Sequence, residues 1–389
     1  MLRLVTEARF EAALGSVAAP ATPSAAAIAR DFRDPYLECV RLLREASEIE
    51  HALMVQYLYA AFSVRPEFEG IAGEADSAGD GLLAVAIQEM QHLSAVSRTL
   101  VALGAEPNLR SQDFPYQIDL YPFPMNLERL SRASIAKYVY AEAPAGYFDV
   151  TEGHPDPEFA KAVRGELGKL KVNHIGSMYL AIIAALKEVQ TSPPFKLPDL
   201  TSRIEALEEV KAEGEAAHFQ LFVQLFKATH SGFGGASGAW SENPDSAKYP
   251  SMPVAKNPIA IPGHPDVIPD SALREIAWIA DLHYWAINIL VDLSFRFPAA
   301  AYLTRAMQHM RKSLFILGNL LASRGQGAPF DPLSTGYSPA PTDVGTRRFL
   351  VQLLLELQRL EDSAKANLPK DYPFNVTTET VNAIRTLGV

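Results

Sequence analysis

Two short segments of the chain repeat a Glu-x-x-His spacing, and this repeat constrains the fold more than any other feature of the sequence. The segments are Glu89–His92 and Glu215–His218. On an α-helix, a carboxylate and an imidazole three residues apart share one face. Two such helices can jointly enclose a metal ion. The spacing therefore predicts packed helices that present polar side chains to one another.

A third carboxylate, Glu50, lies on the apolar stripe of an earlier helical segment, between Leu43 and Tyr57. A carboxylate taken out of water needs a cation, a proton or several hydrogen bonds to offset a desolvation cost of several kcal/mol. Three helices with one inward glutamate each would add mutual repulsion, which a divalent metal relieves. Glu50, Glu89, His92, Glu215 and His218 are therefore the candidate metal ligands.

A Glu-x-x-His pair taken alone is more often a surface pair than a set of ligands. A third case of this spacing, Glu48–His51, is present beside Glu50. His51 follows Glu50 by one residue and points about 100° away around the helix, so we interpret His51 as a flanking group. The metal hypothesis depends on the three helices packing together.

Composition limits the classes of function. The chain has 389 residues, 48% of them hydrophobic and 21% charged, as in folded soluble proteins. Its net charge of -10 disfavours nucleic acid and anionic membrane surfaces as partners. The N-terminus lacks an uninterrupted apolar stretch of a secretory signal, and we find no apolar window long enough to span a membrane. With Cys39 as its single cysteine, we expect a cytoplasmic protein.

Helical periodicity dominates the chain, and the connections between helices have informative lengths. The four predicted bundle helices are 35–64, 81–103, 157–189 and 198–229. The connections between the first and second and between the third and fourth are short. A crossover of over fifty residues, 105–156, joins the second to the third and contains the predicted helix 127–141. One long crossover between two helical hairpins is the ferritin-like four-helix topology, so we predict an all-α fold of this type. We expect residues 1–230 to form this bundle with an N-terminal arm, 231–269 a Gly/Pro/Ser-rich loop, and 270–389 a C-terminal helical extension. The predicted helices cover about 35–64, 81–103, 127–141, 157–189, 198–229, 271–297, 299–324 and 344–368.

Several motifs resemble those of a known family. They follow one another in the order expected for the ferritin-like domain of iminophenyl-pyruvate dimer synthases, enzymes of bisindole pigment pathways such as those of violacein and rebeccamycin. The resemblance covers roughly residues 40–226. It rests on Glu48–Ala52, Gln56–Leu58, Gln88–His92, Leu103–Leu109, Ala141–Pro144, Ile175–Gly176 before Tyr179, and Glu213–Glu215 leading into His218–Phe219.

The resemblance implies a metal site whose ligands map onto the same five candidate residues, and an oxidative coupling of imino acids derived from aromatic amino acids. One position departs from the family pattern: Ser177 stands where the third helix of the family places a glutamate. Glu142 or His174 would be substitutes for the missing carboxylate. Otherwise a water molecule fills the gap, or the site holds a single metal. The family's chains are also far longer than this one.

The donor set suits iron in a di-iron or mononuclear site, with manganese or zinc in its place as further candidates. We therefore predict a metal-dependent oxidoreductase of secondary metabolism that acts on a small organic substrate. The competing hypothesis is a non-catalytic ferritin-like scaffold or binding protein with a degenerate metal site. A homodimer is compatible with both functions.

Overall fold

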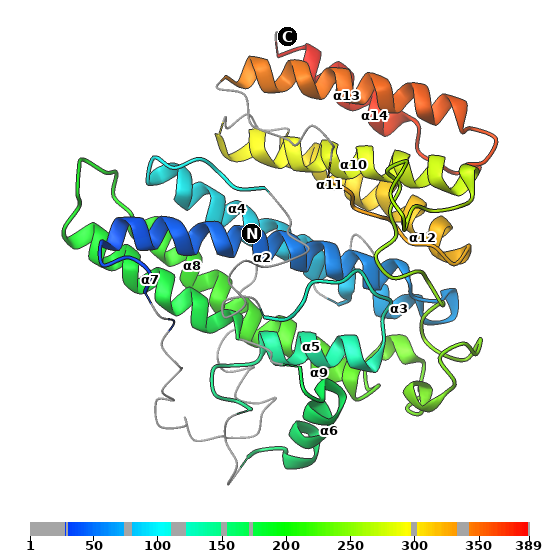
Figure 1. Cartoon of the computed structure of the whole chain (residues 1–389), viewed down its shortest axis with the longest axis horizontal. Helices are drawn as coiled ribbons and strands as arrows, with labels where there is room; N and C mark the ends of the chain where they lie inside the picture. Colours follow the sequence, from blue (N-terminus) through cyan, green and yellow to red (C-terminus); the bar gives the residue numbers. More distant parts are fainter. Residues whose placement is uncertain are drawn as a thin grey trace. The chain divides into compact units, whose positions relative to one another are not determined.

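The computed structural model describes residues 28, 30–73, 80–109, 122–148, 154–170, 174–296, 302–332 and 342–387 (Figure 1). Within these ranges the regular elements are helices, and β-structure is limited to the isolated bridges Val64–Ser251 and Ile259–Val267. The predicted all-α fold is confirmed. The expected lack of an export signal concerns residues 1–27, which lie outside the described ranges.

The chain divides into two compact units, each assembled from separated stretches of sequence. Unit 1 comprises residues 1–42, 115–124 and 132–227, and unit 2 comprises 43–114, 125–131 and 228–389. Each unit is described by itself below. The division into 1–230, 231–269 and 270–389 stays a prediction from the sequence.

Unit 2 contains most of α2 (Pro35–Phe62) and all of α4 (Leu82–Ala102), close to the predicted bounds. Gly104 follows α4 with a φ of +79°, and its N–H donates to the Val101 carbonyl, so a left-handed glycine ends this helix. Gly81 is the N-cap residue of α4, and the carboxylate of the preceding Asp80 lies 3.2 Å from the ring of His230.

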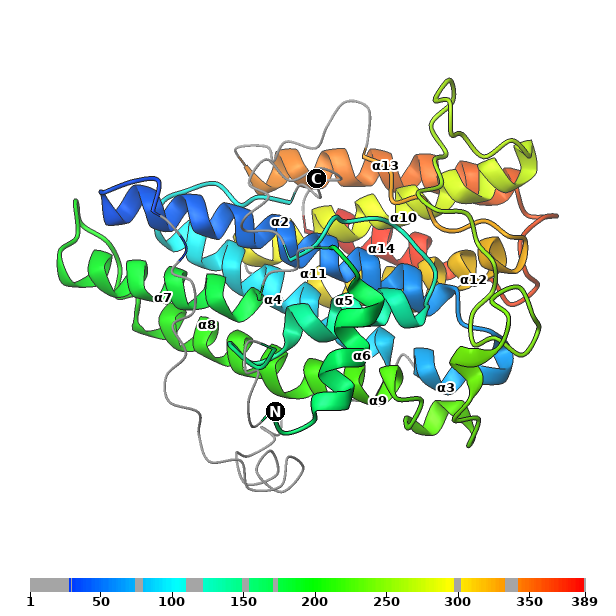
Figure 2. The ribbon, with the colours of Figure 1, turned by 60° about the horizontal axis from the view of Figure 1, so that its bottom comes forward.

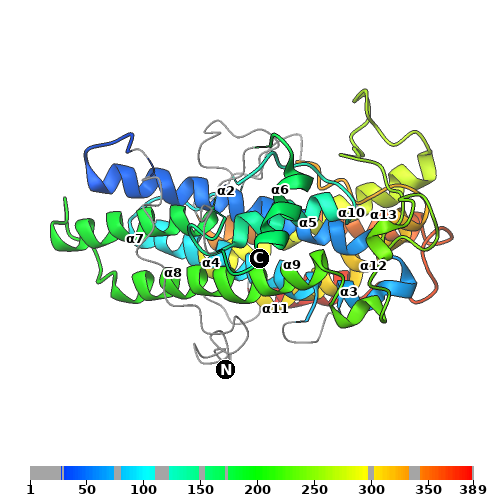
Figure 3. The same ribbon diagram turned by 90° about the horizontal axis from the view of Figure 1, so that it is seen from below.

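Unit 1 contains α5 (Arg132–Glu142), α6 (Pro157–Leu167), α7 (Ile175–Thr191), α8 (Thr201–Glu213), the π-helical turn η2 (Gly214–His218) and α9 (Phe219–Phe226). α5 packs on α6 and α9 (Figure 2), and α7 packs on α8 (Figure 3). The single helix expected over 157–189 is in fact two. α6 ends at Gly168, whose φ of +59° is a left-handed conformation that stops a helix.

The C-terminal part of unit 2 is a layer of packed helices. It contains α10 (Ser271–Arg296), α11 (Tyr302–Gln308), the π-helical turn η5 (His309–Leu314), α12 (Phe315–Ser323), α13 (Asp343–Ser363) and α14 (Asn375–Arg385). α10 packs on α11 and α13, and α13 packs on α14 (Figure 1). We did not predict α14, which follows Pro373 and begins with β-branched residues of low helix propensity. Burial of Val376, Val381 and Ile384 accounts for it.

α10 combines a length of 26 residues with a mostly apolar composition. By length and composition, its residues Ser271–Phe295 are sufficient to cross a membrane, which we did not expect from the sequence. However, 94% of the apolar window is buried inside the protein, as in the core helix of a globular domain. A buried core helix such as α10 can have the composition of a membrane helix, because a helix that is buried all round needs apolar residues on every face.

A buried aspartate pair joins α10 to the chain that follows α12. The Asp331 N–H donates to Asp281 Oδ1 at 3.0 Å, and Asp331 Oδ2 accepts from the N–H groups of Ala260 at 2.6 Å and Ile261 at 3.2 Å. Burial, and then the charge of Asp331, raise the pKa of Asp281 well above its ordinary value. Asp281 therefore keeps its proton in the folded protein.

Asp281→Asn should remove a pH dependence of stability. Because the pKa of Asp281 is raised on folding, its stabilising contribution is present below the unfolded value near pH 4 and is lost as pH rises. As the pH rises above about 4, the wild type should lose unfolding free energy relative to the variant, by at most about 1.4 kcal/mol per pH unit. Urea unfolding at three pH values measures this, and parallel pH profiles would contradict the assignment.

Candidate metal-binding groups

One cluster of potential ligands in unit 2 brings together Glu50 of α2 with Glu89 and His92 of α4. One ligand atom from each of the three residues lies within 4.8 Å of the other two. His92 Nδ1 lies 2.9 Å from Glu89 Oε2 and 3.5 Å from Glu50 Oε2. All three side chains are buried. The first Glu-x-x-His pair and the α2 carboxylate thus meet as the sequence predicts, and we call them the Glu50 cluster.

Electrostatics in the Glu50 cluster favour a positive charge. Burial, and then the neighbouring charge of Glu89, raise the pKa of Glu50 to about 8. Two buried carboxylates thus compete for one imidazole, and a proton shared by the pair would relieve their repulsion. A divalent cation would replace that proton and satisfy both carboxylates.

Residues around the Glu50 cluster fix α2 against the end of α4. The Ser47 hydroxyl donates to the Asn108 carbonyl at 2.6 Å, and the Asn108 amide donates to Glu48 Oε1 at 2.8 Å. We missed this role of Asn108 in the sequence, although it lies in one of the motifs that carry the family resemblance. Glu48 faces away from the cluster, as we expected.

His51 has a different partner. Burial lowers the pKa of His51 to about 4, so the ring is neutral, and its Nε2 lies 2.7 Å from the hydroxyl of Tyr284 on α10. A hydrogen bond therefore joins the ring to the tyrosine hydroxyl. His51 ties α2 to the core helix, which fits the flanking role predicted for it.

Unit 1 contains a second group, formed by Glu142 at the end of α5 and His218 at the end of η2. His218 Nδ1 lies 3.8 Å from Glu142 Oε2, and both side chains are buried. A Cβ atom at Gly214 would lie 2.9 Å from Glu142 Oε2, so the carboxylate fits only against a glycine. Glu142, which the sequence suggested as a substitute ligand, is the carboxylate of this group.

The second Glu-x-x-His pair does not lie on a plain α-helix. Glu215 and His218 both belong to the π-helical turn η2, whose i→i+5 hydrogen bonds put about one more residue in each turn. Residues three apart are then further apart around the helix axis. Glu215 Oε2 accepts from Lys211 Nζ at 2.6 Å, and the Glu215 side chain is 20% exposed. Glu215 is thus paired with a cation of its own chain.

The two other positions suggested by the sequence lie at the start of α7. His174 is the N-cap residue, and its ring stacks on Tyr140 at a centroid distance of 4.9 Å. Ser177 is half-buried in the first turn. Between them, Gly176 packs against Glu215, because a Cβ atom at this position would collide with Glu215 Oε1. The α7 position next to Ser177 therefore accommodates the Glu215 carboxylate.

These donors fit a transition metal. Carboxylate oxygens and imidazole nitrogens bind iron, manganese and zinc, and the Glu50 cluster offers both types from two rigid helices. Glycines at 176 and 214 leave room for the carboxylates of unit 1. Buried glutamates on helices would be unfavourable without some such compensation.

Comparisons with known proteins agree with this architecture. Residues 43–227 match the ferritin-like family, and this part of the chain is a ferritin-like domain. The chain is also similar to dichlorochromopyrrolate synthase of Lentzea aerocolonigenes, at 24% identity over 338 residues, covering 69% of this chain and 32% of that protein. The chain therefore spans about a third of the length of this relative. No solved structure matches the chain.

Gly176→Ala should destabilise the protein although alanine is the better helix former. The new Cβ would collide with Glu215, and overpacking of this kind costs about 1–3 kcal/mol. Gly165→Ala in α6 is the matched control, because nothing lies within 4 Å of its added Cβ, and it should stabilise by roughly 0.5–1 kcal/mol. Urea unfolding compares the two, and equal effects would argue against the close approach of Glu215.

Proposed function

We propose that this protein, whose residues 43–227 form a ferritin-like domain, is an iron- or manganese-dependent oxidoreductase that acts on a small organic substrate. The observation that carries the proposal is the Glu50 cluster, in which two buried carboxylates and an imidazole from two helices converge. Similarity to dichlorochromopyrrolate synthase supports an enzymatic function. The resemblance of the sequence motifs to those of iminophenyl-pyruvate dimer synthases suggests an oxidative reaction on an amino-acid-derived imino acid.

In this proposal the chain's own residues bind the metal and control its surroundings. Glu50, Glu89 and His92 would hold a metal ion, and the metal when bound would supply one-electron or two-electron redox chemistry. Glu142 and His218 are the ligands that unit 1 offers. The sequence predicts that both groups serve one metal centre, and a metal count tests that prediction. Burial of the donors excludes water from the ligands.

One observation favours a non-catalytic scaffold instead. Lys211 neutralises Glu215, so this glutamate is compensated without a metal ion. A chain that uses internal cations in this way could keep a polar core after losing the third-helix carboxylate at Ser177. The cytoplasmic location, the small-molecule partner, the homodimer and a place in secondary metabolism stay predictions from the sequence.

Replacing Glu89 by glutamine should weaken anaerobic binding of Fe(II) by at least tenfold, because the amide keeps the size of the side chain but removes a charged ligand. Glu208→Gln is the matched control, since Glu208 pairs with Lys187 on the exposed surface. Fe(II) titration followed by calorimetry measures the affinity, and circular dichroism checks the helices. Equal binding by both variants would contradict the role of Glu89.

Activity is tested separately from binding. An amino-acid oxidase that uses O2 can generate the imino acids from aromatic amino acids. The iron-loaded protein should add oxygen consumption beyond that of the oxidase alone, and Glu89→Gln should abolish this excess. Metal binding without oxygen consumption for any imino acid would support the non-catalytic scaffold.

A further inference from the structure

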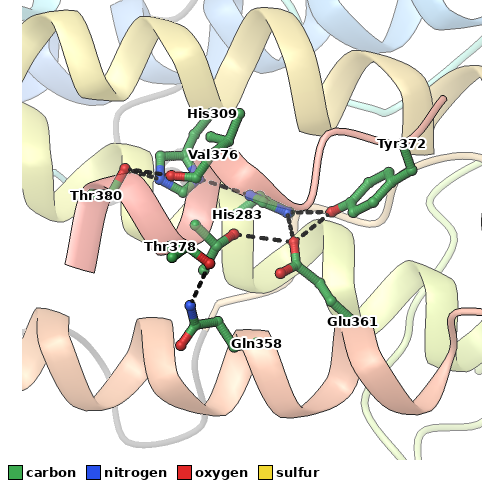
Figure 4. A network of polar contacts seen from close by, with 9 residues as sticks. His283, His309, Gln358, Glu361, Tyr372, Val376, Thr378 and Thr380 are labelled. Carbon is green, nitrogen blue, oxygen red and sulfur yellow. Dashed lines mark hydrogen bonds and ion pairs between the residues drawn. The ribbon is translucent and has the colours of Figure 1, made fainter. Parts of the chain in front are cut away.

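A network of buried polar side chains lies in the C-terminal layer of unit 2 (Figure 4). It joins His283 of α10, His309 of η5, Glu361 of α13 and Tyr372 of the connection to α14, and it ends at Thr380 of α14. These side chains are all buried, with His283 and His309 fully inaccessible. None of them belongs to the candidate metal-binding groups. From the sequence we interpreted this region as an extension without a functional site.

The contacts form an unbroken chain. His283 Nε2 lies 3.1 Å from Glu361 Oε1 and 2.7 Å from the Tyr372 hydroxyl, and His283 Nδ1 lies 2.8 Å from His309 Nδ1. His309 Nε2 lies 3.0 Å from the Thr380 hydroxyl. Glu361 Oε1 also accepts from the hydroxyls of Tyr372 at 2.7 Å and Thr377 at 3.0 Å.

The hydroxyl groups at the two ends of this chain determine where the ring protons must be. Tyr372 uses its hydrogen on Glu361, so His283 Nε2 must donate. Thr380 uses its hydrogen on the Val376 carbonyl at 2.8 Å, so His309 Nε2 must also donate. The Nδ1–Nδ1 contact needs one more hydrogen, because two lone pairs would repel at that distance. Two rings thus carry three N–H hydrogens, whereas two neutral imidazoles have two.

The extra proton gives the histidine pair one positive charge, and the surroundings place that charge on His283. His283 lies next to the carboxylate of Glu361. Burial, then the proximity of His283 and of Arg305 on α11, lower the pKa of His309 well below its ordinary value. Arg305 in turn pairs with Glu379 of α14 at 3.2 Å. His309 is therefore the neutral ring of the pair.

We propose that His283 and Glu361 form a buried imidazolium–carboxylate pair, with His309 as a neutral Nε2–H tautomer, and that this pair is a latch holding α13 and α14 on α10. Hydrogen bonds join side chains of the four elements α10, η5, α13 and α14, and this arrangement depends on one proton. Loss of that proton would force the Thr380 hydroxyl to turn from Val376 to His309 Nε2 and would leave the Glu361 charge without a counter-ion. The latch thus has two states that differ by one proton and one hydroxyl rotation.

The protonation state can be read directly by NMR of the full chain with ¹⁵N-labelled histidine rings at pH 7. We expect both ring nitrogens of His283 to be protonated, and only Nε2 of His309. Glu361→Gln should turn His283 into a neutral ring. Glu356→Gln is the matched control, because it removes a carboxylate from α13 that pairs with Arg359 on the exposed surface, and it should leave His283 unchanged.

Two results would overturn the proposal. A neutral His283 ring in the wild type would show that Thr380 donates to His309, and an imidazolium that persists in Glu361→Gln would show that Glu361 is not its counter-ion. If Glu361→Gln fails to fold, Tyr372→Phe decides instead. That variant keeps Glu361 beside His283, so the imidazolium must persist, and a neutral ring in it would overturn the proposal.

The latch itself is tested by hydrogen exchange of the α14 amides. Glu361→Gln should speed their exchange at least tenfold over Glu356→Gln, because the pair that joins α13 to α10 is lost. Equal exchange in the two variants would show that the pair does not hold the layer together. Fe(II) binding should be unchanged in Glu361→Gln, which separates failure of the latch from failure of the proposed metal site.

Discussion

The cost of burying a carboxylate is the constraint on which much of this structure depends. An ionised carboxyl group inside a helical core loses several kcal/mol of hydration unless a proton, a cation or several hydrogen bonds replace it. Glu50, Glu89, Asp281 and Glu361 are each at most 1% exposed. The group that offsets the lost hydration differs among these four carboxylates. This difference separates the carboxylates that stabilise the fold from those that could bind a ligand.

Asp281 and Glu361 are compensated by groups of the protein itself. The raised pKa of Asp281 favours its protonated form, and its Oδ1 accepts from the Asp331 N–H, whereas Glu361 lies within hydrogen-bond distance of a histidine, a tyrosine and a threonine. The Glu50 cluster differs, because two carboxylates share one imidazole and the pKa of Glu50 rises to about 8. A cation would relieve this cluster more than the others. That contrast within one chain is the physical basis for proposing that Glu50, Glu89 and His92 bind a metal.

Periodicity predicted most helices and the Glu50 cluster because Glu89 and His92 lie on a regular α-helix, where three residues correspond to one face. It did not predict the π-helical turn that contains Glu215 and His218 and changes the number of residues per turn, and the role of these two residues as metal ligands stays a prediction. α14 was missed because tertiary burial of Val376 and Ile384 outweighs its low helix propensity. The histidine network was missed because its members are far apart in sequence and share no spacing.

The metal content of the chain tests the central claim most directly. Protein purified without metal resin should contain iron or manganese in stoichiometric amount by plasma mass spectrometry. About one atom per chain would indicate a mononuclear site at the Glu50 cluster, and about two would indicate a second bound metal, for which Glu142 and His218 are the further candidate ligands. A content near zero, even after anaerobic loading with iron, would contradict the account and leave the buried glutamates as a proton-sharing polar core.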